Sequence, residues 1–136
     1  MLQKTKQYKN HSKIKGVCAT EQQDQIAFIQ YAKTDKILSQ YLFAIPNGGS
    51  RHYLEAINLK KMGVKSGVSD LFLAYPSKGY HGLFIEMKRK GLTYRSLTAK
   101  QIDWRNKMNN VGYLSEVAFG LDNAIKLVKS YLYETE

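Results

Sequence analysis

An internal disulfide bond is excluded by the cysteine content, because Cys18 is the only cysteine among the 136 residues. A single thiol also cannot build a cysteine-cluster zinc site. No apolar stretch approaches the roughly 20 residues of a membrane-spanning helix, and the amino-terminal residues contain no apolar signal-peptide core. We therefore expect a protein without membrane segments in a reducing compartment, the cytoplasm.

Acidic residues are also scarce: 11 Asp and Glu stand against 21 Lys and Arg, which gives a net charge of +10. Such an excess in one small domain favours a polyanionic partner. Nucleic acid is the first candidate and an anionic membrane surface the second, while a basic protein without a special partner stays open. Hydrophobic residues make up 43% of the chain and charged residues 24%, so most of it is expected to fold around a core.

Residues 1–20 predict a basic N-terminal arm in front of a single domain over residues 21–136. The first 20 residues carry five lysines, no acidic residue and no periodic hydrophobic pattern. Arms of this kind either lie along phosphate backbones or form frayed tails, and the sequence leaves both interpretations open.

The remainder of the chain alternates helical and extended patterns. Helices are expected over about 21–33, 52–62 and 98–111 and after Gly120, and strands over 41–45, 71–75, 83–87 and 113–119. Two of the helices begin with capping-box spacings, at Thr20 and Thr98. This order predicts an α/β domain with a mixed β-sheet flanked by helices.

Four groups of apolar residues are candidates for the core. Residues 41–45 are expected to form a buried strand, and the helix after Gly120 carries an apolar stripe at helical spacing. The other expected core residues are Leu54, Ile57, Leu59 and Met62 in the second helix, and Ile102, Met108 and Val111 in the third.

Two acidic residues belong to a predicted hairpin. The turn residues 76–79 separate strands 71–75 and 83–87, so Asp70 precedes the first strand and Glu86 lies near the end of the second. A hairpin pairs the start of one strand with the end of the next, so the two carboxylates can approach each other. They repel unless a cation or a proton intervenes, and such oxygen ligands suit Mg²⁺ or Mn²⁺.

Lys88 can reach the same place, because Phe84, Glu86 and Lys88 share one face of the second strand. A hard divalent ion neutralises a scissile phosphodiester and lowers the pKa of a bound water. Lys88 could then hold the attacking water or stabilise the pentavalent phosphate. The simpler alternative is a Glu–Lys pair at a hydrated sheet edge.

Asp70 together with Glu86, Met87 and Lys88 resembles the signature of the PD-(D/E)XK nucleases. The surrounding segments resemble a narrower group within that superfamily, the virus-type replication-repair nuclease family, VRR-NUC, over about residues 21–133. In the family's order, these segments are 41–49 with Arg51, 63–71, 81–88, Gln101 with Trp104, Gly112 with Tyr113, and 120–132.

The resemblance implies a restriction-endonuclease-like PD-(D/E)XK core and divalent-metal cleavage of DNA. Asp70 and Glu86 would bind Mg²⁺ or Mn²⁺ with the main-chain carbonyl of Met87, and Lys88 would be the catalytic lysine. The family's usual proline before the first aspartate is replaced by Ser69 in this sequence. We expect the activity to survive this replacement. Three further residues match family positions: Glu21 in the metal site, Gln25 one turn later, and Gln101 in the catalytic site.

Each of these assignments has a simpler alternative. Glu21 could be only a favourable acid in the first turn of a helix. Gln101 could merely complete the capping box that begins at Thr98.

DNA contacts are expected from two regions. Asn47, Gly48 and Gly49 form a turn that permits close approach of the backbone, and Arg51 adds a phosphate donor. The other region is a basic cluster whose contacts would go to phosphates, which position DNA without reading its sequence. Its members are Arg89, Lys90, Arg95 and Lys100.

The leading hypothesis is therefore a structure-selective DNA endonuclease that cuts branched DNA such as four-way junctions. The resemblance further implies a homodimer in the cytoplasm of a bacterium or a phage-infected host. The alternative is a catalytically inactive nucleic-acid-binding module, and a third option is a basic interaction protein that binds no nucleic acid.

Overall fold

A four-stranded mixed sheet forms the centre of the computed structural model, which describes residues 18–46 and 53–135. Its strands, in spatial order, are β1 (Leu42–Ala44), β2 (Leu71–Leu73), β3 (Leu83–Lys88) and β4 (Leu114–Phe119). The pairs β1–β2 and β2–β3 are antiparallel, whereas β4 runs parallel to β3. The predicted α/β class with a mixed sheet and the β2–β3 hairpin are confirmed. Residues 1–17 of the expected arm lie outside the described residues.

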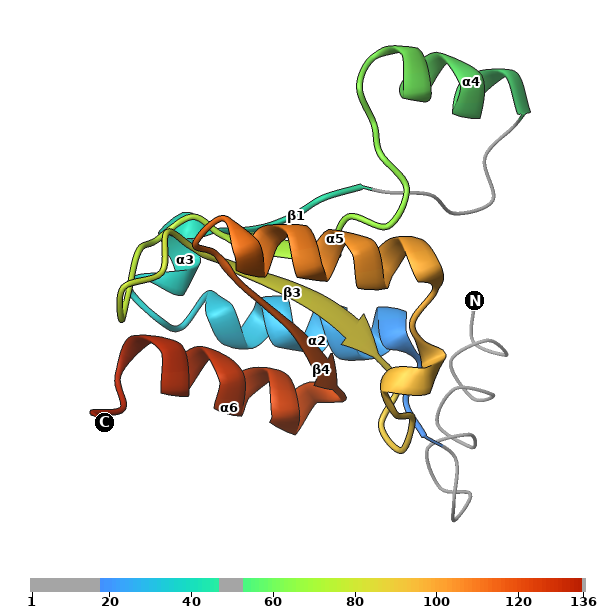
Figure 1. Ribbon diagram of the computed structural model, residues 1–136. Coiled ribbons are helices and arrows are strands. Elements are labelled where there is room, and N and C mark those ends of the chain that lie inside the picture. The colour runs from blue at the N-terminus through green and yellow to red at the C-terminus, as the bar shows by residue number, and fades with distance from the viewer. Residues whose placement is uncertain (1–17, 47–52, 136) are drawn as a thin grey trace.

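Helices cover both faces of this sheet (Figure 1). They are α2 (Glu21–Ala32), α3 (Leu38–Tyr41), α4 (Tyr53–Lys61), the 3₁₀ turn η1 (Tyr94–Ser96), α5 (Ala99–Asn110) and α6 (Leu121–Leu132). Helices α2 and α6 pack together on one face and α5 lies on the other, while α4 projects from the body. No helix in the described part of the chain is long and apolar enough to cross a membrane.

The central strand β3 is buried on both faces because helices lie above and below it. Leu83, Ile85 and Met87 belong to the main core with Phe28 of α2 and Val128 of α6. The alternate residues point to the α5 face. Strand β3 thereby carries core residues on one side, and Phe84, Glu86 and Lys88 on the other.

Helices α2 and α5 begin where their capping boxes predict. The Thr20 hydroxyl accepts a hydrogen bond from the Gln23 N–H (3.1 Å), and the Gln23 side chain accepts one from the Thr20 N–H (2.9 Å). Thr98 and Gln101 make the same reciprocal pair at the start of α5. Both predicted boundaries are confirmed to within a residue.

Predictions about burial are wrong at three elements, namely β1, the second helix and α5. Strand β1 was expected to be buried, but it is the edge strand and Phe43 is 49% exposed. Of the apolar stripe predicted for the second helix, Leu54 on α4 is 62% exposed and Met62, just after the helix, is 80% exposed, because α4 projects from the body. Ile57 and Leu59 are half-buried. The apolar pattern predicted the helix correctly but not the exposure of these side chains.

Helix α5 also presents a different face to the sheet than predicted. Ile102 and Val111, expected in the core, are 43% and 58% exposed. The helix packs instead through Trp104, whose ring lies edge-on to Phe84 at 5.4 Å. Gln101 precedes Trp104 by three residues, so this packing places Gln101 on the sheet side of the helix as well.

Candidate functional site

The start of β2 and the end of β3 bring two carboxylates together. Leu71 pairs with Ile85 in the antiparallel ladder, and the same register places Asp70 opposite Glu86. The Asp70 Oδ2 accepts a hydrogen bond from the Met87 N–H at 2.7 Å. Asp70 is therefore fixed to the strand that carries Glu86.

Glu86 and Lys88 lie on the α5 face of β3, and each is only 8% exposed. Phe84 fills the inner part of that face and stacks on Phe72 with ring centroids 4.3 Å apart. The aromatic pair leaves the two charged residues at the end of the strand. They do not form the hydrated edge pair of the simpler alternative.

Gln101 connects helix α5 to Glu86. Its Nε2 donates a hydrogen bond to the Glu86 Oε1 at 2.9 Å, and its Oε1 accepts one from the Thr98 N–H at 2.9 Å. One amide group thus completes the capping box and also holds the carboxylate. The two interpretations of Gln101 are compatible.

Burial controls the protonation of this pair. Removal from water, together with the nearby charge of Asp70, raises the pKa of Glu86 to about 8, although the charge of Lys88 opposes the shift. Burial also raises the pKa of Asp70, against the effect of the Met87 N–H bond. At neutral pH and without a cation, the two carboxyl groups therefore retain a proton between them.

Two hollows meet at Asp70. The first, which we call the carboxylate cleft, has a volume of about 530 Å³. The second, the α2 groove, has a volume of about 370 Å³ and lies beside the first turns of α2. The cleft is lined by Ser66, Gly67, Val68, Asp70, Glu86, Thr98, Ala99, Lys100 and Gln101, and the groove by Glu21, Gln22, Gln25, Ile26 and Asp70.

Glu21 lies at the edge of this arrangement. It is exposed in the first turn of α2, and its charge raises the pKa values of both Asp70 and Glu86. Among residues 18–46 and 53–135, no three His, Cys, Asp or Glu side chains form a group that could hold a metal ion. The carboxylates in direct proximity are therefore Asp70 and Glu86, with Glu21 within electrostatic reach.

The basic residues predicted to contact DNA are distributed around this site. Lys100 lines the carboxylate cleft, whereas Lys90 lines a different groove on the side of α2 and α6. Arg89 and Arg95 are exposed, the latter in η1. The expected contacts Asn47, Gly48 and Arg51 lie outside the described residues.

Gly67 allows a close contact beside the cleft that the sequence motifs did not predict. Its φ is +88°, and a Cβ atom there would lie 2.5 Å from the Lys100 carbonyl oxygen. Only glycine lets the loop before Asp70 contact the first turn of α5 so closely. The glycine in the loop was the available signal, but its partner could not be identified from the sequence.

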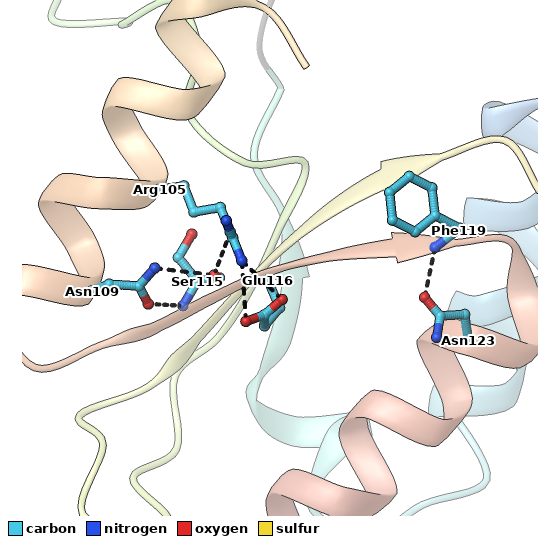
Figure 2. Close-up of polar contacts among 6 residues, drawn as sticks. All are labelled: Arg105, Asn109, Ser115, Glu116, Phe119 and Asn123. Carbon is cyan, nitrogen blue, oxygen red and sulfur yellow. Dashed lines mark hydrogen bonds and ion pairs between the residues drawn. The ribbon is translucent and has the colours of Figure 1, made fainter. Parts of the chain in front are cut away.

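Polar side chains fix α5 against the free edge of β4 (Figure 2). The Arg105 Nε donates to the Ser115 carbonyl oxygen at 3.2 Å, and the Asn109 Oδ1 accepts from the Ser115 N–H at 2.9 Å. Arg105 also forms an ion pair with Glu116 at 3.3 Å. These contacts fix the helix that carries Gln101.

Comparison with known proteins gives a consistent result. A family model described as the VRR-NUC domain matches residues 8–121. A solved structure described as a VRR_NUC domain protein superposes with a TM-score of 0.72 at 30% sequence identity, covering 85% of this chain and 89% of that chain. No curated protein matches the sequence. The matched region contains the whole carboxylate cleft and both helices that border it.

Proposed function

Because the chain belongs to the VRR-NUC domain family of nucleases, we propose that it is a divalent-metal-dependent DNA endonuclease that hydrolyses phosphodiester bonds. The observation that carries the proposal is the facing pair of half-buried Asp70 and buried Glu86, with buried Lys88 two residues further along β3, beside an open cleft. Two like charges held together and largely removed from water are unfavourable for a plain structural role but suit a cation site.

The donor set fits Mg²⁺ or Mn²⁺. Asp70 and Glu86 offer carboxylate oxygens, which are the ligands that these ions prefer. The pKa values of both groups are raised, so without another positive charge nearby they retain a proton. The N–H and C=O groups of one strand residue point to the same side of the strand. The Met87 N–H donates a hydrogen bond to Asp70, so the Met87 carbonyl oxygen also points toward Asp70. Glu21 is the proposed ligand from α2.

The remaining residues have separable tasks. The bound ion would neutralise charge on the scissile phosphate and lower the pKa of a water. Lys88, whose charge is felt by both carboxylates, would hold the attacking water or stabilise the pentavalent phosphate. Gln101 would keep the Glu86 carboxylate oriented through its 2.9 Å hydrogen bond.

DNA would be held mainly through its phosphates. Lys100 is on the wall of the cleft, and Arg89, Lys90 and Arg95 follow β3. The turn at Asn47 and Gly48 with Arg51 is proposed as a further contact. The net charge of +10 offsets repulsion between the carboxylates and the DNA backbone.

Pairing of two copies would allow the protein to act on two strands of branched DNA. We propose a homodimer whose two sites address two strands of a four-way junction. The support is the resemblance to small members of the family.

A cleavage panel tests the proposed reaction. Single-stranded, duplex, flap and four-way DNA are incubated with the protein in Mg²⁺, Mn²⁺ or EDTA. We expect cleavage only with a divalent ion and most rapidly on the four-way DNA. Salt-sensitive binding without cleavage under any divalent ion would instead support an inactive nucleic-acid-binding module, and absence of binding at low salt would support the third option.

A further inference from the structure

The free edge of strand β4 carries the main-chain groups that no other strand binds. Alternate residues of an edge strand direct their N–H and C=O groups away from the sheet. The N–H groups of Leu114 and Gly120 bond to carbonyl oxygens on the β3 side. The residues whose main-chain groups point outward are therefore Ser115, Val117 and Phe119.

Side chains from the neighbouring helices occupy the two ends of this edge but not its middle (Figure 2). The Asn109 Oδ1 accepts from the Ser115 N–H at 2.9 Å, and the Asn123 Oδ1 accepts from the Phe119 N–H at 2.8 Å. Among the described residues, no hydrogen bond reaches the outward N–H and C=O groups of Val117. Val117 is only 5% exposed, and the main-chain groups of such a residue are almost always paired. This gap indicates a partner from outside the fold.

A hollow of about 500 Å³, which we call the edge hollow, lies along the gap. Tyr94 of η1 and Leu127 of α6 line it together with Val117. Tyr94 belongs to the α5 side of the sheet, where the Arg105 guanidinium lies 5.1 Å from its ring, whereas α6 packs on the other side. A flat group bonded to Val117 in the plane of the sheet would therefore have the tyrosine ring on one side and Leu127 on the other.

The Tyr94 ring is fixed in position and yet open to a ligand. It is 50% exposed, and it lies edge-on to Phe119 at 5.3 Å. The short turn that carries it is held by the Ser96 hydroxyl, which donates to the Thr93 carbonyl oxygen at 2.7 Å. An aromatic surface held in this way loses little freedom when a ligand packs against it.

The pattern of free main-chain groups selects the kind of ligand. An added β-strand needs a run of free N–H and C=O groups, but the occupied residues on both sides of Val117 limit the gap to one donor and one acceptor. The pairing edge of a nucleobase carries a donor beside an acceptor, and bases stack on aromatic side chains. The edge hollow thus matches a single base better than a peptide.

The surrounding charges favour DNA as the source of that base. Residues 87–102, which include η1, contain five lysines and arginines and no acid. Phe119 is the register partner of Lys88, so the hollow lies one strand away from the proposed catalytic lysine. Of the two acids that line the hollow, Glu116 is paired with Arg105 at 3.3 Å. A neutral base tolerates the other acid, while its flanking phosphates can stay on the basic segment.

We propose that the edge hollow binds one unpaired nucleobase of the DNA strand held for cleavage, through the Val117 main chain and the Tyr94 ring. The inference rests on the proposed function in taking DNA as the ligand. In a duplex the pairing edges are occupied, so the hollow selects unpaired positions. Because every base has a pairing edge, this selection reads the structure of the DNA rather than its sequence.

Binding of two oligonucleotides tests the contact with the pairing edge. Labelled single-stranded oligo(dT) and an oligonucleotide of equal length made of N3-methylthymine are titrated with the wild-type protein in EDTA, which prevents metal-dependent cleavage. Fluorescence anisotropy gives the two affinities. The added methyl group removes the donor and blocks the pairing edge without changing the backbone charge. We expect oligo(dT) to bind about tenfold more tightly, the combined effect of two ordinary hydrogen bonds.

Substitutions of Tyr94 assign this preference to the hollow. Tyr94→Leu should weaken oligo(dT) binding about tenfold and leave binding of the methylated oligonucleotide unchanged, because a base that cannot bond to Val117 is not held against the ring. Tyr94→Phe keeps the ring and should bind both as the wild type does. Tyr41→Leu is the matched control, since Tyr41 is 40% exposed beside β1 at the opposite edge of the sheet, and it should change neither affinity.

The inference is overturned by equal binding of the two oligonucleotides to the wild type, or by a loss in Tyr94→Leu that is absent or the same for both. Displacement of oligo(dT) by micromolar thymidine monophosphate would overturn DNA as the source of the base. The cleavage panel remains independent. Preference for oligo(dT) without cleavage would reject the nuclease but keep the edge hollow, and cleavage without the preference would do the reverse.

Discussion

The protonation of Glu86 follows from burial more than from any neighbouring charge. Its pKa of about 8 lies above the ordinary 4.5, so the folded protein favours the neutral form. The contribution of the neutral Glu86 to the stability of the fold is therefore complete below pH 4.5, and it is lost as the pH rises towards 8. A bound cation would reverse this preference, because it stabilises the ionised form.

Replacing Glu86 with glutamine tests the predicted loss of stability with rising pH. In EDTA, Glu86→Gln should increase the free energy of unfolding by on the order of 2 kcal/mol at pH 8 and change it little at pH 4.5. Urea unfolding of both proteins at the two pH values measures the difference. An equal effect at both values, or destabilisation at pH 8, would contradict the assigned protonation.

The double role of Gln101 can be separated by its capping partner. Gln101→Ala and Thr98→Ala each break the same capping box and should each cost about 1 kcal/mol of stability. Only Gln101→Ala removes the donor to Glu86, so only that variant should lose cleavage rate, by about tenfold. Equal cleavage by the two variants would reduce Gln101 to a helix cap.

At the scale of elements, the sequence predicted helix starts and turns, which depend on neighbouring residues. It did not predict which elements pack against each other. Capping pairs at Thr20 and Thr98 and the turn after Pro76 depend on neighbouring residues, and they predicted α2, α5 and the β2–β3 hairpin. The exposure of β1 and α4 depends on which elements lie beside them. No local pattern specifies that neighbourhood.

The contact between the loop before Asp70 and α5 provides a test with a matched control. Gly67 and Gly79 have similar φ angles of +88° and +83°, but only at Gly67 would a Cβ meet another part of the chain, whereas Gly79 has open space. Gly79→Ala should therefore cost only about 1 kcal/mol of backbone strain. Gly67→Ala should also displace the cleft wall and reduce cleavage at least about tenfold.

That comparison is made by measuring urea unfolding and cleavage rate for both variants. If Gly67→Ala cleaves DNA as fast as Gly79→Ala, the close packing of the loop on α5 does not position the site.

On the scale of the whole molecule, the carboxylate pair was predictable because a hairpin has fixed geometry. Asp70 and Glu86 are opposed as soon as the turn is located. The burial of Lys88 and the hydrogen bond from Gln101 required the position of α5, which is set by Trp104, Arg105 and Asn109.

The proposed pairing of two chains has a direct measurement. Light scattering should give a mass twice the 15.6 kDa of one chain at the concentrations used for cleavage. A mass near 15.6 kDa under those conditions would contradict the homodimer.

Cleavage of four-way DNA by Lys88→Ala, compared with Lys107→Ala, tests the central claim most directly. Both variants remove one positive charge, but Lys88 is buried beside the carboxylate pair and Lys107 forms an exposed 2.8 Å ion pair with Asp103 on α5. In Mg²⁺ we expect Lys107→Ala to cut at nearly the wild-type rate, because exposed pairs contribute little. Lys88→Ala should lose at least about 100-fold. Cleavage by purified Lys88→Ala at the wild-type rate would contradict the assignment of this site as the catalytic centre.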